Sequence, residues 1–259
     1  MSTFAPEWLS LREKADAEAR ALDLVDRLDE IDLNRTPLVV RDLGCGTGSM
    51  GRWLSGRLGG RQRWVLHDRD PRLLSIAAAT MTGVAIETRE GDLTGLTAAD
   101  LAGTSLVTAS ALLDLLTADE VDGLAAACVG AGCPALLTLS VAGRVEFDPA
   151  EPVDAEFEAA FNAHQRRVVG GRRLLGPDAA QVAVAAFERR GAAVTTSPSP
   201  WRLGPDQAAL AGEWLRGWVA AAVEQEPRLA GEAPGYLRRK LDGGPRVVVH
   251  HTDLLAVPR

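Results

Sequence analysis

The sequence has few cysteines, few lysines and no long apolar run. Its three cysteines have a spacing that suits neither a disulfide framework nor a zinc site, so we expect a reducing, cytoplasmic environment and no metal. No apolar run approaches the ~20 residues that a membrane helix needs. The first residues lack the basic and apolar regions of a signal peptide. Only Lys14 and Lys240 are lysines, and this arginine bias, with abundant alanine, indicates a GC-rich bacterial genome.

The charge balance is acidic. There are 28 Lys and Arg against 35 Asp and Glu, which gives a net charge of -7. Because an acidic surface repels a phosphate backbone, this balance disfavours a nucleic-acid partner. A hydrophobic fraction of 46% and a charged fraction of 24% are ordinary for a globular protein and argue against disorder. The 259 residues fit one α/β domain with additions.

Short apolar strands alternate with helices in the first half of the chain. Asp70-Pro71 and Thr117 to Glu120 have the residue types that begin helices. Such alternation indicates parallel βαβ units with right-handed crossovers, and therefore a three-layer α/β sandwich. Strands are predicted at 38–43, 64–67, 84–88, 105–108 and 134–139.

The flanking segments follow a different pattern. Apolar residues at helical spacing predict a helix over 7–30. We expect a loop over 141–152, a helix over 153–167, a flexible break at 168–171, helices over 177–190, 205–225 and 234–241, and strands over 192–196 and 246–256. The predicted organisation is an N-terminal helical cap (1–36), a core (37–140), a lid insertion (141–175) and a C-terminal part (176–259), all in one domain.

The strongest motif runs from Val39 to Gly48. A strand ends in Asp42, and glycines follow at alternate positions, which lets the backbone pass close to a ligand. The next helix directs its free N–H groups towards that ligand. A plain glycine-rich turn is one alternative. A dinucleotide-binding fingerprint is another, although the sixth position counted from Gly44 is Ser49 rather than glycine, which disfavours it.

Two acids follow at the ends of the next strands. Asp68 stands about 20 residues past the glycine turn, where a carboxylate can accept both ribose hydroxyls of an adenosine cofactor. Asp92, after the third strand, can accept a hydrogen bond from an adenine amino group, and Leu93 can cover the ring. An ordinary surface turn is the alternative for each acid.

In these motifs the chain resembles the class I S-adenosylmethionine-dependent methyltransferases. Residues 42–48 look like that family's first motif, and Asp68 stands where its ribose-binding acid belongs. Gly91-Asp92-Leu93 looks like its adenine-side motif. Residues 106–114 are similar to its fourth strand and to the loop that borders the methyl group. The resemblance implies S-adenosylmethionine as cofactor and a seven-stranded, mostly parallel sheet with a reversed last strand. The residues it assigns to the cofactor are Asp42, Gly44, Cys45, Gly46, Gly48, Asp68, Arg69, Asp92, Leu93 and Ser110.

The expected acceptor is a small molecule, methylated on oxygen, nitrogen or carbon. No Asn/Asp-Pro-Pro-Tyr/Phe motif follows the fourth strand, where Ser110 to Leu113 stand, and that motif marks many enzymes that methylate base or glutamine amino groups. The alternatives are a nucleic-acid methyltransferase, an NAD(P)-dependent oxidoreductase, and a non-catalytic protein that binds S-adenosylmethionine.

Three segments are candidate walls of the acceptor site. They are the N-terminal helix, the insertion at 141–175, read as a mobile lid because it holds paired glycines, and the stretch around Trp201. The candidate substrate-binding residues are Trp8, Arg12, Arg20, Gln165 and Trp201. Trp214 and Trp218 share a helix face that indicates core or a homodimer interface.

His164 is the first candidate for a general base. A histidine titrates near about pH 6.5, so it can accept a proton at neutral pH. It shares a helix face with Phe157 and Phe161, at spacings of seven and three, and packing beside them is the competing interpretation. Asp114 is the second candidate catalytic residue.

Overall fold

The computed structural model describes residues 5–28, 31, 37–242, 244 and 246–259. Its centre is a twisted sheet with the strand order β3-β2-β1-β4-β5-β10-β8. β1 to β5 pair in parallel, and β10 runs antiparallel to both β5 and β8. The expected sheet with a reversed last strand is confirmed. The strands are β1 (Leu38–Leu43), β2 (Gln62–Asp68), β3 (Ala85–Glu90), β4 (Leu106–Ser110), β5 (Ala135–Asp148), β8 (Ala193–Pro198), β9 (Trp201–Leu203) and β10 (Arg246–Val257).

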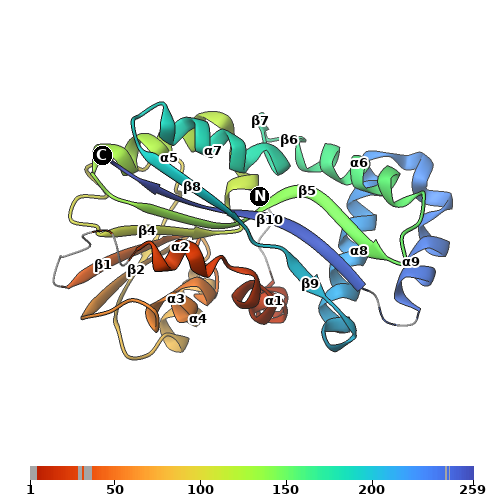
Figure 1. The fold of residues 1–259 in the computed structure, drawn as a ribbon, viewed down its shortest axis with the longest axis horizontal. Helices are drawn as coiled ribbons and strands as arrows, with labels where there is room; N and C mark the ends of the chain where they lie inside the picture. Colours follow the sequence, from red (N-terminus) through yellow and green to blue (C-terminus); the bar gives the residue numbers. More distant parts are fainter. Residues whose placement is uncertain (1–4, 29–30, 32–36, 243, 245) are drawn as a thin grey trace.

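Helices cover both faces of the sheet, as the three-layer prediction required (Figure 1). On one face, α2 (Leu22–Asp26), α3 (Ser49–Ser55) and α4 (Pro71–Thr80) enclose a core that contains Trp53 and Trp64. On the other face, α5 (Ala118–Gly130) and α7 (Ala179–Glu188) enclose a core rich in leucine and alanine. Burial of these apolar side chains stabilises the layers by roughly 25 cal/mol per Å² removed from water.

A third apolar cluster surrounds the long ends of β5 and β10. It is covered by α6 (Asp154–Gln165), α8 (Ala208–Gln225) and α9 (Ala233–Leu241), with α1 (Pro6–Ala19) beside it (Figure 1). The prediction of a loop over 141–152 was wrong for its first part, since β5 continues to Asp148 and pairs with β10 up to Arg246. Exposure alternates along this extension, as in a half-buried strand. β9, which was not predicted, pairs with the same stretch of β10.

The helix predicted over 7–30 breaks after Ala19. Arg20 has an extended backbone (ψ 135°), and the short α2 starts at Leu22. The cause lies far away in sequence: the buried carboxylate of Asp253 accepts a hydrogen bond from Ala21 N (2.9 Å), and also from Leu139 N (2.7 Å). Buried backbone donors need partners, so this acid fixes the turn against the sheet. Residues 29–30 of the predicted helix lie outside the described residues.

The break predicted at 168–171 is a β-hairpin. β6 (Val168–Val169) pairs with β7 (Arg172–Arg173), and Gly170 and Gly171 form the turn with φ values of +58° and +80°. Two positive φ angles in succession are required by the two-residue hairpin turn that matches strand twist, and glycine adopts them without a Cβ clash.

The predicted helix starts are confirmed. Asp70 accepts from Arg72 N at 2.9 Å, and Thr117 and Glu120 form a reciprocal capping box at the start of α5. The remaining short helical turns are η1 (Leu113–Leu115), η2 (Gly176–Asp178), η3 (Pro205–Gln207) and η4 (Pro227–Gly231). No helix within the described ranges has the length and apolar character needed to cross a membrane.

Candidate active site

The glycine turn after β1 has a left-handed backbone at its glycines. Gly44 and Gly46 have φ values of +64° and +55°. A Cβ at Gly44 would stand 3.1 Å from Leu112 Cδ1, and one at Gly46 would stand 3.2 Å from Leu9 Cδ1. Both the backbone angle and the space therefore require glycine, and the turn leaves a cradle with main chain at its surface.

Asp68, at the end of β2, holds this turn. Its Oδ2 accepts from Gly46 N at 2.9 Å, and its Oδ1 accepts from Asp70 N at 3.0 Å. A carboxylate offers about four acceptor sites. Asp68 therefore fixes the cradle and can still accept further hydrogen bonds. Its half-buried side chain lines the cavity at the carboxyl ends of the strands.

Asp42 forms the floor beneath the cradle. It is fully buried, and its Oδ1 accepts from Thr108 Oγ1 at 2.8 Å, while its Oδ2 has no hydrogen-bond partner among the described residues. Burial raises the pKa of Asp42 to about 7, against the smaller opposite effects of the Thr108 hydrogen bond and the Arg20 charge. The floor therefore changes its charge near neutral pH.

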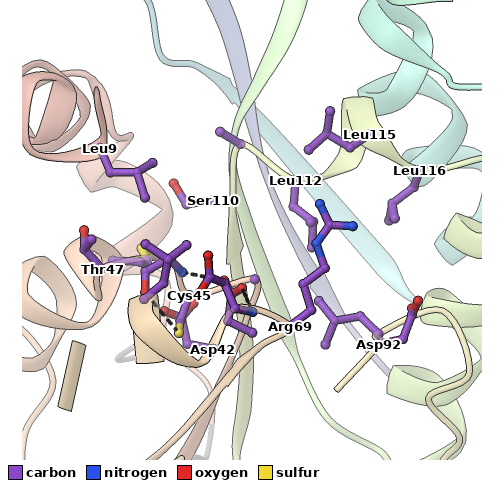
Figure 2. A pocket seen from close by; sticks show the side chains of 18 of the residues that line it. Leu9, Asp42, Cys45, Thr47, Arg69, Asp92, Ser110, Leu112, Leu115 and Leu116 are labelled. Carbon is purple, nitrogen blue, oxygen red and sulfur yellow. Dashed lines mark hydrogen bonds between the residues drawn. The ribbon is translucent and has the colours of Figure 1, made fainter. Parts of the chain in front are cut away.

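Asp92 lies at the opposite side of the site from the α1 segment (Figure 2). Its Oδ1 accepts from Thr94 N at 2.8 Å and from Thr94 Oγ1 at 2.7 Å. These bonds hold the pKa of Asp92 below its usual value, with smaller contributions from the charges of Arg172 and Arg69. Asp92 is thus an ionised acceptor in a fixed turn.

These groups share one cavity of about 350 Å³ at the carboxyl ends of the parallel strands. That edge is where ligands bind in open α/β sheets. Figure 2 shows Leu9, Thr47 and Cys45 on one side, and Leu112, Leu115 and Leu116 on the other, with the Arg69 side chain directed towards the leucines. The cavity therefore joins a polar cradle to an apolar recess.

The segment after β4 enters the cavity in a strained conformation. Ala111 has a φ of +51°, which is uncommon for a residue with a Cβ, and its N–H donates to Thr138 O at 2.9 Å. This turn places Leu112 against Gly44 and leaves Ser110 on the cavity. The backbone here is held by β5 rather than by local preference.

Helix α1 supplies another wall. Leu9, Arg12 and Asp16 line the cavity. Asp16 is buried; its Oδ2 accepts from Arg12 Nε at 2.8 Å and its Oδ1 accepts from Trp201 Nε1 at 3.0 Å. The Arg12 guanidinium carbon also lies 5.5 Å from the centre of the Trp201 ring. These contacts anchor α1 to β9.

The β6–β7 hairpin and its flanks close the cavity from the α6 side. Arg167, Val169, Arg172 and Leu174 line it. Arg172 is fixed by Glu120 of α5, with Nε to Oε1 at 2.8 Å and Nη2 to Oε2 at 2.5 Å. The hairpin is thereby tied to the capping box of α5, and its Val169 lines the cavity.

Residues 40–131 match a family model described as a methyltransferase domain. No curated protein was found to match the chain. The structure resembles the YcgJ protein from Bacillus subtilis (12% identity, TM-score 0.50, covering 92% of this chain and 99% of that chain). It is also similar to an S-adenosylmethionine-dependent methyltransferase from Geobacter sulfurreducens solved with S-adenosyl-L-homocysteine (18% identity, TM-score 0.49, 98% and 99% coverage). At these identities the structural likeness shows the fold alone.

The match places a methyltransferase domain at residues 40–131. A methyltransferase has a methyl acceptor as its substrate, and S-adenosylmethionine is the cofactor expected from the sequence. The oxidoreductase alternative is thereby set aside. The site fits the cofactor, because the left-handed Gly44 and Gly46 leave space that any Cβ would fill, and the buried Asp42 Oδ2 beneath them lacks a partner.

The cavity brings together most of the residues that the sequence assigned to the cofactor. Gly48 is the exception; it turns the chain into α3 with a φ of +86° against Ala77. Burial raises the pKa of the Cys45 thiol. The assigned residues that line the cavity are Asp42, Gly44, Cys45, Gly46, Asp68, Arg69, Asp92, Leu93 and Ser110.

The substrate candidates are divided by the structure. Arg12 lines the cavity, whereas Trp8, Arg20, Gln165 and Trp201 do not. Trp8 lies with Phe161 and Trp214 on a separate, shallower notch. Gln165 lies beneath Gly176, at the start of η2. The helix-face prediction for Trp218 is confirmed as core, since it is buried against Phe147 and Phe157.

Arg20 is buried below the cavity rather than exposed in it. Its Nη2 donates to Ser49 Oγ (3.2 Å) and Ser110 Oγ (3.1 Å), two residues of the cavity lining, and its guanidinium lies 5.3 Å from the Trp53 ring. Burial lowers its pKa. Arg20 therefore supports the cavity from behind.

The two candidate bases have different surroundings. His164 does not line the cavity; its Nε2 lies 3.3 Å from Glu224 Oε2, and burial together with Arg167 lowers its pKa. Asp114, in η1, is half-buried next to the cavity residue Leu115, and burial raises its pKa to about 6. No group of His, Cys, Asp or Glu suited to a metal ion occurs in the part of the chain that the structure describes.

Sequence reasoning missed most of the cavity's apolar lining and two of its arginines. These are Leu9, Leu112, Leu115, Leu116, Arg167, Val169, Arg172 and Leu174. The one available signal was the Val168-Val169-Gly170-Gly171-Arg172 pattern, because paired glycines between β-branched and polar residues favour a two-residue hairpin. Nothing local showed that the hairpin would pack beside the loop after β4.

Proposed function

We propose that this methyltransferase acts on a small molecule. The observation that carries the proposal is the shape of the acceptor end, a recess walled by α1, the loop after β4 and the β6–β7 hairpin, within a cavity of about 350 Å³. Small-molecule sites are enclosed, largely apolar cavities of roughly 300–1,000 Å³ with a few polar groups. A macromolecular acceptor would need an open approach, and the net charge of -7 works against a nucleic acid.

The residues that would hold the cofactor follow from the cradle. The Gly44–Gly46 main chain would lie against the amino-acid part, with Asp42 and Ser110 beside it. Asp68 would accept from the ribose hydroxyls, and Asp92 and Leu93 would border the adenine. Arg20 would keep Ser49 and Ser110 in place from below.

Bound S-adenosylmethionine supplies a methyl group already activated on a sulfonium, so positioning can provide much of the acceleration. The walls on α1 and the hairpin would exclude water and align the acceptor. The Asp114 carboxylate, ionised above about pH 6, would accept the proton that a hydroxyl or ammonium acceptor must lose. Neutral His164 would act through its neighbour Arg167 rather than at the reacting atoms.

A labelled-methyl assay tests this function. The protein is incubated with S-adenosylmethionine that carries a tritiated methyl group, and separately with dialysable metabolites, total RNA and DNA, and total protein. Label should appear in the dialysable fraction, and excess S-adenosylhomocysteine should suppress it. Label confined to nucleic acid or protein would contradict a small-molecule acceptor, and no transfer to any fraction would favour a binding protein without catalysis.

A further inference from the structure

Charged residues of both signs line the cavity, and the acidic ones are Asp16, Asp42, Asp68, Asp70 and Asp92. Four arginines line the cavity: Arg12, Arg69, Arg167 and Arg172. The whole chain carries a net charge of -7. The arginines matter for the acceptor because guanidinium groups recognise carboxylates and phosphates through paired N–H donors.

Two of these arginines are already neutralised. Arg12 donates to Asp16 at 2.8 Å, and Arg172 forms a two-pronged pair with Glu120 at 2.8 and 2.5 Å. Their side chains shape the wall, but each positive charge has a carboxylate against it. They therefore add little attraction for an anion.

Arg167 differs from them. Its Nη1 donates to His164 O at 3.0 Å and lies 3.1 Å from His164 Nδ1. Among the described residues, no carboxylate lies within ion-pair distance of its guanidinium. A guanidinium has five N–H donors, so most of those on Arg167 remain available to a ligand.

His164 fixes Arg167 without cancelling its charge. His164 Nδ1 faces an N–H donor of Arg167, so this nitrogen carries the lone pair. The proton of the neutral ring is therefore assigned to His164 Nε2, which faces Glu224. Burial and the Arg167 charge hold the pKa of His164 below its usual value. The result is a positive charge held in position by a neutral ring.

The acids on the cavity have other partners. Asp16 accepts from Arg12 and Trp201, Asp68 from two backbone N–H groups, and Asp92 from Thr94. Asp42 accepts from Thr108, and Asp70 pairs with Arg72. The apolar residues Val169, of the hairpin, and Leu174, which follows it, line the same cavity, and Leu174 N donates to Arg167 O at 3.2 Å. A half-buried guanidinium next to such a wall favours a ligand with one anionic group and an apolar body.

We propose that the methyl acceptor is an organic anion, a carboxylate or a phosphate on an apolar skeleton, and that Arg167 binds its charged group. This inference rests on the proposed small-molecule function. The apolar body of the acceptor would lie against the cavity's leucines and Val169. Its charged group would lie against Arg167, for which no carboxylate partner is found among the described residues.

The first test compares four ligands with the same ring: benzoate, phenyl phosphate, benzamide and benzylamine. Their dissociation constants are measured by calorimetry with the protein saturated by S-adenosylhomocysteine. At least one anion should bind ~10-fold more tightly than benzamide, because a charge-assisted hydrogen bond contributes more than a neutral one. The tighter of the two anions identifies the head group. Equal affinity for benzamide, or tighter binding of benzylamine, would overturn the proposal.

The second test uses variants of the hairpin region. Arg167→Gln should remove the preference for the anion, and Arg167→Lys should keep part of it. Arg173→Gln is the matched control, since Arg173 is exposed on the same hairpin and does not line the cavity. S-adenosylhomocysteine should bind all three variants as it binds the wild type, which also shows that they are folded. Loss of that affinity in Arg167→Gln would assign Arg167 to the cofactor's own carboxylate instead.

The role of His164 as a positioning residue has its own readout. His164→Ala should reduce the ratio of benzoate to benzamide affinity, and His164→Gln should restore it, because an amide oxygen can accept from Arg167 Nη1. A ratio unchanged in both variants would remove His164 from the site.

The labelled-methyl assay separates failure of this inference from failure of the proposed function. Label in a neutral or cationic metabolite would overturn the anionic acceptor and leave the small-molecule function standing. Label confined to RNA or protein would overturn the proposed function, and the anionic acceptor with it, even if Arg167 still bound benzoate.

Discussion

The guanidinium of Arg20, at the end of α1, donates to the hydroxyl of Ser110, at the end of β4, across a distance of 3.1 Å. The same Nη2 also donates to Ser49 Oγ at 3.2 Å. One buried side chain thus connects the amino-terminal helix, the helix after the glycine turn and the end of β4. Arg20 is predicted to affect the cofactor site from below.

Arg20→Met should therefore lower both the melting temperature and the affinity for S-adenosylhomocysteine. Hydrogen bonds to charged groups are each worth about 1.5–3 kcal/mol, and the two serine hydroxyls would lose their buried partner. Thermal melts and calorimetry measure the two effects. Arg27→Met, at an exposed arginine just past α2, is the control. A variant with wild-type cofactor affinity and altered acceptor preference would instead restore the sequence-based prediction that Arg20 binds substrate.

Asp68→Ala should weaken S-adenosylhomocysteine binding by roughly 1.5–3 kcal/mol, the range for hydrogen bonds to a charged group. The structure adds a second expectation: the free protein should also melt at a lower temperature, because Asp68 accepts from Gly46 N and Asp70 N. Glu188→Ala, at an exposed acid of α7, serves as the control. An unchanged affinity in Asp68→Ala would show that another group holds the ribose.

Asp42→Asn should change how stability depends on pH. In the wild type the folded pKa of Asp42 is raised from 3.8 to about 7, so its stabilising contribution is complete below about pH 4 and is lost as pH rises to about 7. Each pH unit in that window corresponds to about 1.4 kcal/mol. An asparagine cannot ionise, and its oxygen can still accept from Thr108. The free variant should therefore gain stability over the wild type between pH 4 and 7, as measured by denaturant unfolding; parallel curves would contradict the buried-acid assignment.

Asp114→Asn should lower turnover by ~100-fold or more if the acceptor must lose a proton. The wild-type rate should rise with pH through about 6, where the Asp114 carboxylate ionises, and then level off. Binding of S-adenosylhomocysteine should not change. Asp119→Asn, at an exposed acid in the first turn of α5, is the matched control. Full turnover in a folded Asp114→Asn would leave the chemistry to proximity alone.

Hydrogen exchange tests the lid. The sequence predicted mobility over 141–175, but residues 141–148 belong to β5, so their amides should be protected with and without ligand. Residues 168–174, which include cavity-lining positions, should exchange more slowly once S-adenosylhomocysteine binds. Equal exchange in this segment in both states would show that the hairpin is a fixed wall.

The sequence by itself determined the local features of this protein. The glycine turn, Asp68 and Asp92 each stand at or just after the carboxyl end of a parallel strand. The carboxyl ends of parallel strands lie at one edge of a sheet, so the strand order alone brings these residues together. The helix caps at Asp70 and Thr117 need only neighbours within three residues. Strand alternation likewise predicted the layers, because burial is periodic along each element.

Only the tertiary structure decided the rest, because it depends on contacts between residues far apart in the chain. Asp253 ends α1 early by bonding Ala21, 232 positions away, and the 12-residue β10 turns an expected loop into the end of β5. The position of the Arg167 charge at the cavity likewise could not be predicted from the sequence, because nothing local distinguishes this arginine from the others. Arg166 and Arg172 pair with carboxylates on η2 and α5, whereas Arg167 has no such partner in the part of the chain that the structure describes.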